Sequence, residues 1–525
     1  MTNYEFSIPM LRALVIGISL VFAVAGGAGS APAHTGSNIA WHPASSVADV
    51  DKAFAAAKRS GKPVFLYWGA VWCPPCNQVK ATLFSRPDFV ERSKAFVLVY
   101  VDGDRPGAQQ VAARFKVQGY PTMIVFRPDG TEITRLPGEV DPERYLMTMT
   151  AGMNAEVPVR DLVRRVELRE SLTPEQWRLL AYYSWDTDEQ QVFTVGDLGR
   201  KLANLASAAP PEQPLVRDRL ALKALVASAR ADSKEDPGTS QATRLLVERV
   251  VADAVAFRQL SDLVASNAEL IVKQVSPAGD IRRSLAARLD KALELLAQDA
   301  SLSRADQIDL LDSRIAMWKL LDDSDILRPV RQTLVIQQIA KVVSATTDRY
   351  ERQAVVPNAA HVLAAAGLLE QSDELLRQEL PRAVAPYYHM LGLAGNAKAR
   401  KDSKNALFWY EQAWQKSEGR ATRIQWGTGF VNQIVKLTPS DVMRVEAAAS
   451  AVVAQLEPKG ETFYERNERS LRGMANQLLS WQGSDQSRIR VVSRLKIKIE
   501  KTCSQVPKKE AGRAKCEGVA SVLGA

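Results

Sequence analysis

The sequence predicts an α/β layer domain near the N-terminus, followed by a long all-helical region. A short apolar strand leads directly into two cysteines that are separated by two residues, and a helix follows them. Strands and helices then alternate up to about residue 155. After Pro158 the strand-like runs vanish, and Ala, Leu, Arg, Gln and Glu predominate with helical spacing. A chain of 525 residues with 46% hydrophobic content is long enough for more than one such domain.

The elements of the first domain can be predicted in order. A helix near 47–59 is followed by Gly61 at a C-cap position, and residues 62–70 form a largely apolar strand of the kind found in sheet centres. After the cysteines the apolar spacing becomes helical and stays free of Gly and Pro until Pro87. Further strands are expected at 96–101, 122–126 and 132–136, with a hairpin turn at 128–131. Helices are expected at 108–115 and from residue 141.

The stretch Trp72-Cys73-Pro74-Pro75-Cys76 carries the chemistry of the chain. Its cysteine spacing suits half of a zinc site, but a tetrahedral site needs a second ligand pair at comparable spacing. The chain has four histidines, and its other cysteines lie more than four hundred positions away. Counting ligands therefore disfavours a metal and favours redox chemistry, with no cofactor beyond a redox-active Cys73–Cys76 disulfide.

The two cysteines receive different roles from their positions. Cys73 lies at a helix N-terminus, where unpaired N–H groups and the helix dipole stabilise a thiolate, so it is expected to be the exposed, attacking nucleophile. Cys76, one turn into the helix and facing inward, is expected to resolve the mixed disulfide.

The motif after a buried strand, together with Gly119-Tyr120-Pro121-Thr122 before a later strand, resembles the thioredoxin fold over residues 40–155. Residues 81–90 and the strand ending at Asp102 most resemble periplasmic DsbD-type domains. The resemblance implies that Pro121 is a cis-proline, and that Trp72, Tyr120 and Pro121 contribute to substrate binding. The buried acid that such domains usually carry is missing, because Leu66 or Tyr67 stands at its position.

The direction of electron flow depends on how well the Cys73 thiolate is stabilised. Pro74 and Pro75 supply no cation and remove two N–H donors, which favours a reductase over an oxidase or isomerase. A fixed disulfide in a non-catalytic helical-repeat binding or scaffold protein is the rival interpretation. The favoured interpretation requires disulfide or thiol clients and an upstream electron donor.

The N-terminus predicts export. Residues 13–25 hold no charge and precede small residues ending in Ala31-Pro32-Ala33, which is typical of a signal peptide over residues 1–33, with translation from Met1 or Met10. The apolar run is short for a stable membrane span, so a periplasmic or secreted protein is expected. The net charge of +9 is interleaved with acids, which gives no support to nucleic-acid binding.

The first domain is assigned to residues 34–155 and the helical region to 160–525, with breaks near 208–214, 276–280 and 356–358. Between Met390 and Ala413, small and aromatic residues are spaced as in tetratricopeptide repeats (TPRs). A TPR-like solenoid would offer a surface for a protein partner and control access to Cys73, whereas a bundle of helical hairpins would only stabilise the chain. The tryptophans of this region are interpreted as core anchors.

Two smaller features complete the predictions. Cys503 and Cys516 lie on either side of Pro507 and are expected to form a structural disulfide that clamps a helix hairpin, with a second redox pair as the alternative. Asp102 and Asp104 follow a strand and are interpreted as a solvated turn.

Overall fold

Five strands form one mixed sheet in the computed structural model, which describes residues 39–117, 119–136, 142–231, 241–321 and 325–524. The strand order is β1-β3-β2-β4-β5, with β1 and β2 parallel to β3, and β4 antiparallel to both β2 and β5. The strands are β1 (Trp41–Ala44), β2 (Val64–Gly69), β3 (Val97–Asp102), β4 (Thr122–Phe126) and β5 (Glu132–Leu136). The expected signal peptide at 1–33 lies outside the described residues.

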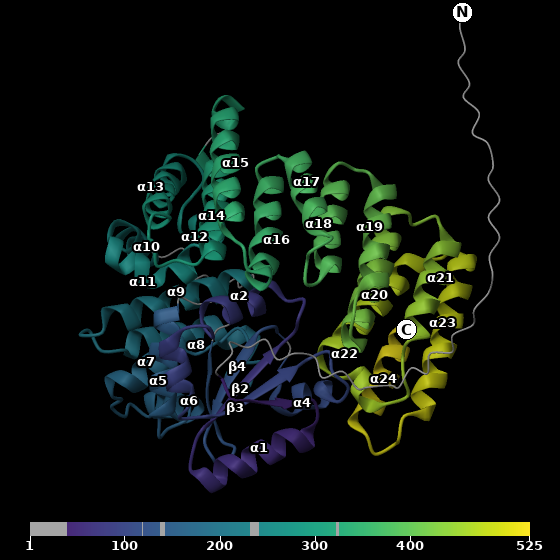
Figure 1. Cartoon of the computed structure of the whole chain (residues 1–525), viewed down its shortest axis with the longest axis horizontal. Coiled ribbons are helices and arrows are strands. Elements are labelled where there is room, and N and C mark those ends of the chain that lie inside the picture. Colours follow the sequence, from purple (N-terminus) through teal and green to yellow (C-terminus); the bar gives the residue numbers. More distant parts are fainter. Residues whose placement is uncertain (1–38, 118, 137–141, 232–240, 322–324, 525) are drawn as a thin grey trace, which may run out of the picture. The chain divides into compact units, whose positions relative to one another are not determined.

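Helices cover both faces of this sheet (Figure 1). They are α1 (Val47–Ser60), α2 (Pro74–Thr82), α3 (Pro87–Ser93), α4 (Ala108–Phe115) and α5 (Pro142–Met153). On one face α1 and α4 pack on Val64, Leu66 and Trp68 of β2. On the other face α2, α3 and α5 pack around Phe65 and Tyr67. Because side chains of a strand alternate between faces, β2 is buried on both sides, as its apolar sequence predicts.

The sequence predicted most of this domain, with two omissions. The α/β fold is confirmed, and Gly61 ends α1 in the left-handed conformation with φ of 67°. The edge strand β1 was missed because it has only four residues, including Pro43. The short helix α3, which begins at Pro87, was also missed.

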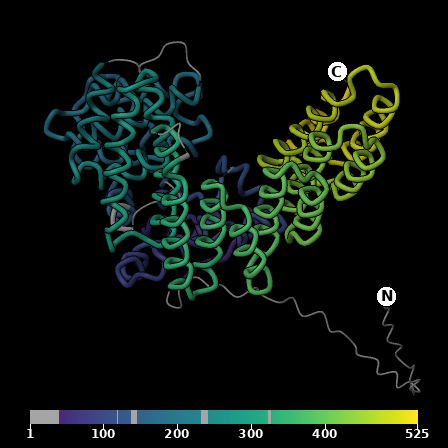
Figure 2. Tube along the Cα trace, turned by 90° about the horizontal axis from the view of Figure 1, so that it is seen from above, coloured from purple at the N-terminus to yellow at the C-terminus, as the bar shows by residue number. Residues whose placement is uncertain are grey.

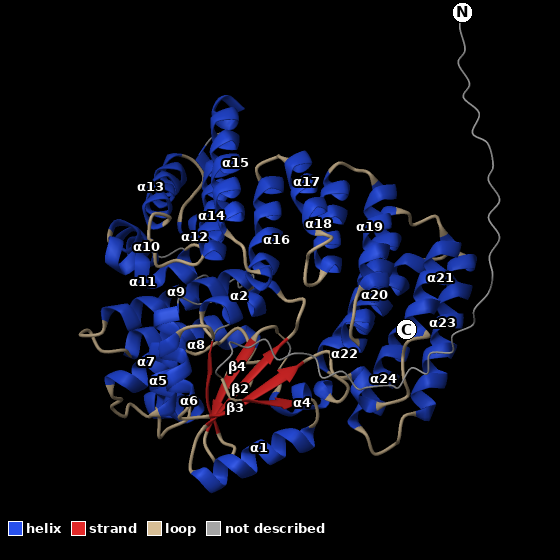
Figure 3. Cartoon of the chain, viewed as in Figure 1, coloured by secondary structure: helices blue, strands red, loops and turns tan. Residues whose placement is uncertain are grey.

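From residue 159 onward, the described part of the chain contains helices and no strands (Figure 3). Successive helices pack as neighbours, and those after about residue 350 follow one another in a row of hairpins (Figure 2). The α-helices are α6 (Val159–Glu167), α7 (Pro174–Tyr182), α8 (Val195–Ala208), α9 (Pro214–Arg230), α10 (Gln241–Ala252), α11 (Ala254–Val264), α12 (Ala268–Val275), α13 (Asp280–Leu296), α14 (Arg304–Leu321), α15 (Arg328–Ala345), α16 (Arg349–Ala365), α17 (Leu369–Glu379), α18 (Pro386–Ala399), α19 (Ser403–Lys416), α20 (Arg420–Leu437), α21 (Val442–Val453), α22 (Glu465–Gln482), α23 (Gln486–Gln505) and α24 (Ala511–Val522).

Two of the three predicted helix breaks coincide with loops, and the third is wrong. The predicted break at 208–214 contains the loop 209–213 between α8 and α9, and the one at 276–280 contains the loop 276–279 between α12 and α13. At 356–358 the helix α16 continues through Pro357. A proline removes one backbone hydrogen bond, and the surrounding Val355, Val356 and Ala359 are fully buried. Packing of these side chains holds the helix together despite the proline.

The helical region is joined to the α/β domain by a buried arginine. Arg135 of β5 forms an ion pair with Glu132 and donates to the backbone oxygens of Lys116 and Thr187, while its own carbonyl oxygen accepts the N–H of Ser184 at 3.0 Å.

Among the described residues, no helix combines the length and the apolar content needed to cross a bilayer.

Candidate functional site

The cysteine pair lies between the end of β2 and the first turn of α2. Cys73 and Cys76 are joined in a disulfide. Cys73 is the N-cap of α2, and its sulfur accepts the backbone N–H of Cys76 at 3.1 Å. Pro74 and Pro75 occupy the start of the helix, where a missing N–H costs no intrahelical bond. In the reduced protein this cap geometry would favour a thiolate at Cys73.

The expected difference in exposure between the two cysteines is absent. Cys73 is 1% exposed, Cys76 is 0% exposed and Trp72 is 6% exposed. The reason is that the apolar cluster around the cysteines continues into the helical region through Tyr387 and Met390 of α18. The sequence pattern of one domain cannot reveal a cover supplied by another.

We call the parts of α16, α18 and α20 that lie over the motif the cover, and they contact the motif through Trp72. The indole ring stacks with Tyr388 at a centroid distance of 6.3 Å and meets Trp426 edge-on at 6.2 Å. Gln353 of α16 links the motif to the cover, because its Nε2 donates to the carbonyl oxygen of Trp72 at 3.4 Å and its Oε1 accepts the N–H of Ala385 at 3.1 Å. Trp426, interpreted as a core anchor, therefore also contacts the redox motif.

Asp104 connects the motif to α20, so the interpretation of this turn as solvated is wrong. One carboxylate oxygen accepts from Trp72 Nε1 at 2.8 Å. The other accepts from the backbone N–H and the hydroxyl of Thr422 at 3.1 and 2.6 Å. Burial raises the pKa of Asp104 to about 6, against the lowering effect of these hydrogen bonds. Gly419 allows this approach, because a Cβ there would lie 2.5 Å from the Asp104 Cβ.

The parallel order of β2 and β3 is a signal from which the position of Asp104 beside the motif could have been predicted. Strands β2 and β3 are parallel, and Gly69 lies opposite Asp102 in the register. Residues that follow the two strands therefore meet at the same edge of the sheet, which brings Asp104 to Trp72. The partner on α20 lies 318 positions further along the chain, and no local pattern predicts it.

The substrate-binding residues implied by the resemblance lie next to the motif. The peptide bond between Tyr120 and Pro121 is cis. The ring of Tyr120 lies 5.3 Å from that of Trp72, and the Arg466 guanidinium lies over both rings at 5.5 Å or less. The structure thus brings Trp72, Tyr120 and Pro121 together with Cys73 and Cys76, and their roles remain predictions.

On β2, the strand before the motif, Tyr67 faces the cysteines in place of the buried acid that the sequence lacks. Tyr67 is buried, and its hydroxyl lies 3.4 Å from the carbonyl oxygen of Cys76. Its ring stacks on Tyr100, over which the Lys80 ammonium lies at 5.5 Å. Burial raises the pKa of Asp102, and burial lowers that of Lys80 despite the opposing charge of Asp102. A titratable pair therefore stands on α2 and β3, although neither residue is on the strand before the motif.

Cys503 and Cys516 form a second disulfide, between α23 and α24. Both residues are buried in an apolar cluster of the C-terminal helices that does not include the redox cysteines. This pairing was expected from the sequence. Across the described ranges, no group of three His, Cys, Asp or Glu side chains is arranged to hold a metal ion.

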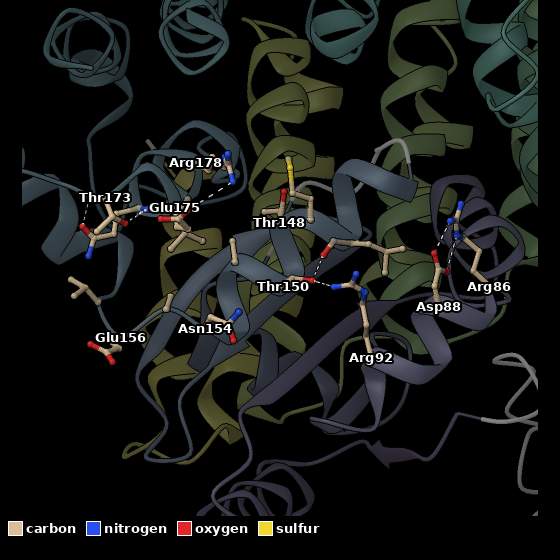
Figure 4. A pocket seen from close by; sticks show the side chains of 17 residues that line it. Arg86, Asp88, Arg92, Thr148, Thr150, Asn154, Glu156, Thr173, Glu175 and Arg178 are labelled. Atoms are coloured by element: carbon tan, nitrogen blue, oxygen red, sulfur yellow. Dashed lines mark hydrogen bonds and ion pairs between the residues drawn. The ribbon is translucent and has the colours of Figure 1, made fainter. Parts of the chain in front are cut away.

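A cavity of about 710 Å³ lies away from the cysteines, between α3, α5 and α7 (Figure 4). Its arginines have local partners, since Arg92 donates to Thr150 and Arg86 forms a two-point ion pair with Asp88. Neither cysteine of the motif contributes to its lining. The cavity therefore does not belong to the redox site.

Comparisons with known proteins match the first domain. A thioredoxin-like domain profile matches residues 50–152. The thiol:disulfide interchange proteins DsbD of Pseudomonas fluorescens and Klebsiella pneumoniae are 32% and 36% identical over 114 and 112 residues, each covering 21% of this chain. The chain spans about a fifth of the length of these relatives, 20% and 18%. Thioredoxin H5 of Arabidopsis thaliana is 36% identical over 88 residues, which cover 17% of this chain and 69% of that protein.

Proposed function

The chain belongs to the thioredoxin-like family through its first domain, and from that premise we propose that it is an exported thiol:disulfide oxidoreductase that reduces protein disulfides. The observation that carries the proposal is the Cys73–Cys76 disulfide at the start of α2, with the Cys73 sulfur in the cap position. Support for export comes from the apolar N-terminal run and from similarity to DsbD.

The proposed reaction transfers two electrons from the cysteine pair to a client. The Cys73 thiolate attacks one sulfur of the client disulfide, which forms a mixed disulfide and releases the other client sulfur as a thiolate. The Cys76 thiolate then attacks the Cys73 sulfur, which closes the Cys73–Cys76 disulfide and releases the second client thiolate. An upstream dithiol donor reduces the pair again, and the redox-active disulfide serves as the only cofactor.

In this proposal the helical region controls access to Cys73. Because Cys73 is 1% exposed, its sulfur cannot meet a client sulfur in line, so the contacts of Trp72 with Gln353, Tyr388 and Asp104 must open before attack. A protein partner bound to the helical hairpins is one means of opening.

The burial of Cys73 also favours a second candidate, a helical scaffold in which the disulfide only stabilises the fold. A Cys76→Ser variant distinguishes the two. The oxidoreductase should accumulate mixed disulfides with cell-envelope proteins through Cys73, and the wild-type protein should reduce insulin. The absence of both would exclude the enzyme. A Cys73→Ser/Cys76→Ser variant is the control for adducts through other sites.

A further inference from the structure

The last part of the chain holds most of its net positive charge. Residues 485–525, which include α23 and α24, contain ten cationic and four acidic side chains. Their excess of six is the larger part of the net charge of +9 of the whole chain. Acids and cations are mixed here along the sequence, so only the fold can show whether both signs reach the same surface.

Helix α23 separates the two signs between its sides. It packs against α21, α22 and α24 through five buried side chains, which are Val491, Val492, Leu495, Ile499 and Cys503. With 3.6 residues per turn, the opposite side of the helix carries four exposed residues: Arg490, Arg494, Ile497 and Lys501. The one acid within α23, Glu500, lies on the flank of the helix, 3.8 Å from the Lys496 ammonium. The outward side of α23 therefore carries cations and no acid.

Most of these cations have no partner. We call Arg490, Arg494 and Lys501, together with Lys508 and Lys509 of the following loop, the basic stripe, and all five are exposed. Arg494 forms a two-point ion pair with Glu446 of α21, at 2.7 and 2.8 Å. The side chains of the other four have no ionic or hydrogen-bonded partner in the part of the chain that the structure describes. Like charges four residues apart, such as Arg490 and Arg494, destabilise a helix, so helix stability gives no reason for the stripe.

Two large apolar side chains are exposed beside the basic stripe. Ile497, in the middle of the stripe, is 63% exposed, and Met443 of α21 is 83% exposed. The contacts that join α21 to α23 link residues at a constant sequence separation of 48, so the two helices lie side by side and run in the same direction (Figure 1). Met443, near the start of α21, therefore lies toward the Arg490 end of α23. Single exposed apolar residues are common on protein surfaces, but these two lie among cations.

The shape and the chemistry of this surface fit a flat anionic partner. The outer surface of a helix is convex, so it can lie on a flat partner but cannot enclose a peptide. The headgroups of an anionic bilayer attract Lys and Arg, and the bilayer interface accepts apolar side chains between them. A nucleic acid would gain only the phosphate attraction, because the basic stripe has no aromatic side chain to stack on bases.

We propose that the basic stripe, together with Ile497 and Met443, binds the surface of a bilayer that contains anionic phospholipid. Each Lys or Arg near such a surface strengthens binding about fivefold, and apolar side chains add to this when they enter the interface. Binding of this peripheral kind needs no membrane-spanning helix. The inference goes beyond the proposed redox function and does not depend on it.

Vesicles of phosphatidylcholine, with or without phosphatidylglycerol, test the proposal. Residues Thr35–Ala525 form a compact unit of their own, so the assay uses this chain, which leaves out the apolar run at 13–25 that would bind lipid by itself. Sedimentation with the vesicles should show binding only when phosphatidylglycerol is present. Raising the salt to about 0.5 M should release most of the protein, because exposed charges are screened.

The test variants change exposed side chains of the outward side, so the core of the helical region is left intact. Arg490→Gln/Lys501→Gln/Lys508→Gln should weaken binding about a hundredfold, because three cations are lost at about fivefold each. Ile497→Ser should weaken it about fivefold, because an apolar side chain no longer enters the interface. Circular dichroism checks that each variant keeps its helices.

The matched control removes the same number of charges elsewhere. Lys52→Gln/Lys58→Gln/Arg59→Gln changes three exposed cations of α1 on the α/β domain and should leave binding within about twofold of the wild type. Equal binding of the wild-type chain to both kinds of vesicle would overturn the inference. Equal losses in the stripe and α1 variants would also overturn it, because net charge would then account for the binding.

A second measurement tests other anionic partners. Fluorescence anisotropy with a labelled DNA duplex and a labelled oligoglutamate peptide uses the same chain at the same salt. Binding to either of these without binding to phosphatidylglycerol vesicles would assign the basic stripe to another class of partner and overturn the inference. Vesicle binding that depends on Ile497 as well as on the cations would support it, because a purely ionic partner offers no interface for an apolar side chain.

Discussion

Replacing Asp104 with alanine should uncover Cys73. The carboxylate accepts from Trp72 Nε1 at 2.8 Å and from the Thr422 hydroxyl at 2.6 Å, and it is the only acceptor described for either donor. A donor left without a partner costs about 1–3 kcal/mol, which gives about 2–6 kcal/mol for the two. The raised pKa of about 6 means that the ionised carboxylate destabilises the covered state, and removing it stabilises that state by about 3 kcal/mol at neutral pH. With about 2 kcal/mol for each of the two donors, the net loss is about 1 kcal/mol, so the open state should become roughly 5-fold more populated.

The rate of alkylation reports this population. The protein is reduced, and modification of Cys73 by iodoacetamide is followed by mass spectrometry at neutral pH. Asp104→Ala should react faster by the same factor, whereas Asp88→Asn, which removes an exposed carboxylate of α3 away from the motif, should react like the wild type. Equal rates for Asp104→Ala and the wild type would refute the idea that Asp104 holds the cover in place.

Three further predictions concern the same contacts and the second disulfide. The pKa of Asp104 is about 6 in the covered state and near 4 once the carboxyl is exposed, so the covered state binds the proton more tightly. The covered state is therefore most stable below about pH 4, and this stabilisation is lost as the pH rises to about 6. Hydrogen exchange of α2 amides should show this dependence relative to intrinsic rates, and Asp104→Asn should abolish it. Gly419→Ala, at a φ of 85° and with its Cβ 2.5 Å from Asp104, should speed alkylation of Cys73, while Gly429→Ala, with nothing within 4 Å, should not. Cys503→Ser/Cys516→Ser should cost about 3 kcal/mol in denaturant unfolding of the C-terminal helices and leave insulin reduction intact; an unchanged midpoint would contradict the structural role.

Local patterns predicted the elements that carry the chemistry. The apolar run of β2 and the cysteine spacing are local, so the position of the disulfide at the start of α2 followed from them. Pro357 shows the limit of a local rule, because burial of its neighbours outweighed the backbone bond that it lacks.

The cover over Cys73 could not be predicted in the same way. Gln353 and Tyr388 contact Trp72, and Thr422 contacts Asp104, from positions 281 or more residues away. Each of the three looks like an ordinary helix residue in the sequence. Long-range packing of this kind leaves no periodicity in either segment. The exposure expected of Cys73 was therefore wrong, although its place at the helix N-terminus was right.

The reduction potential of the Cys73–Cys76 pair in the full chain tests the central claim most directly. The protein is equilibrated with glutathione buffers and trapped with a thiol reagent, and the oxidised fraction of this pair is counted by mass spectrometry. For a reductase with an uncharged Pro-Pro dipeptide, the reduction potential of the pair should lie near that of thioredoxin, about −270 mV. A value near −120 mV would reverse the direction of electron flow, and a pair that never equilibrates would contradict the redox function itself.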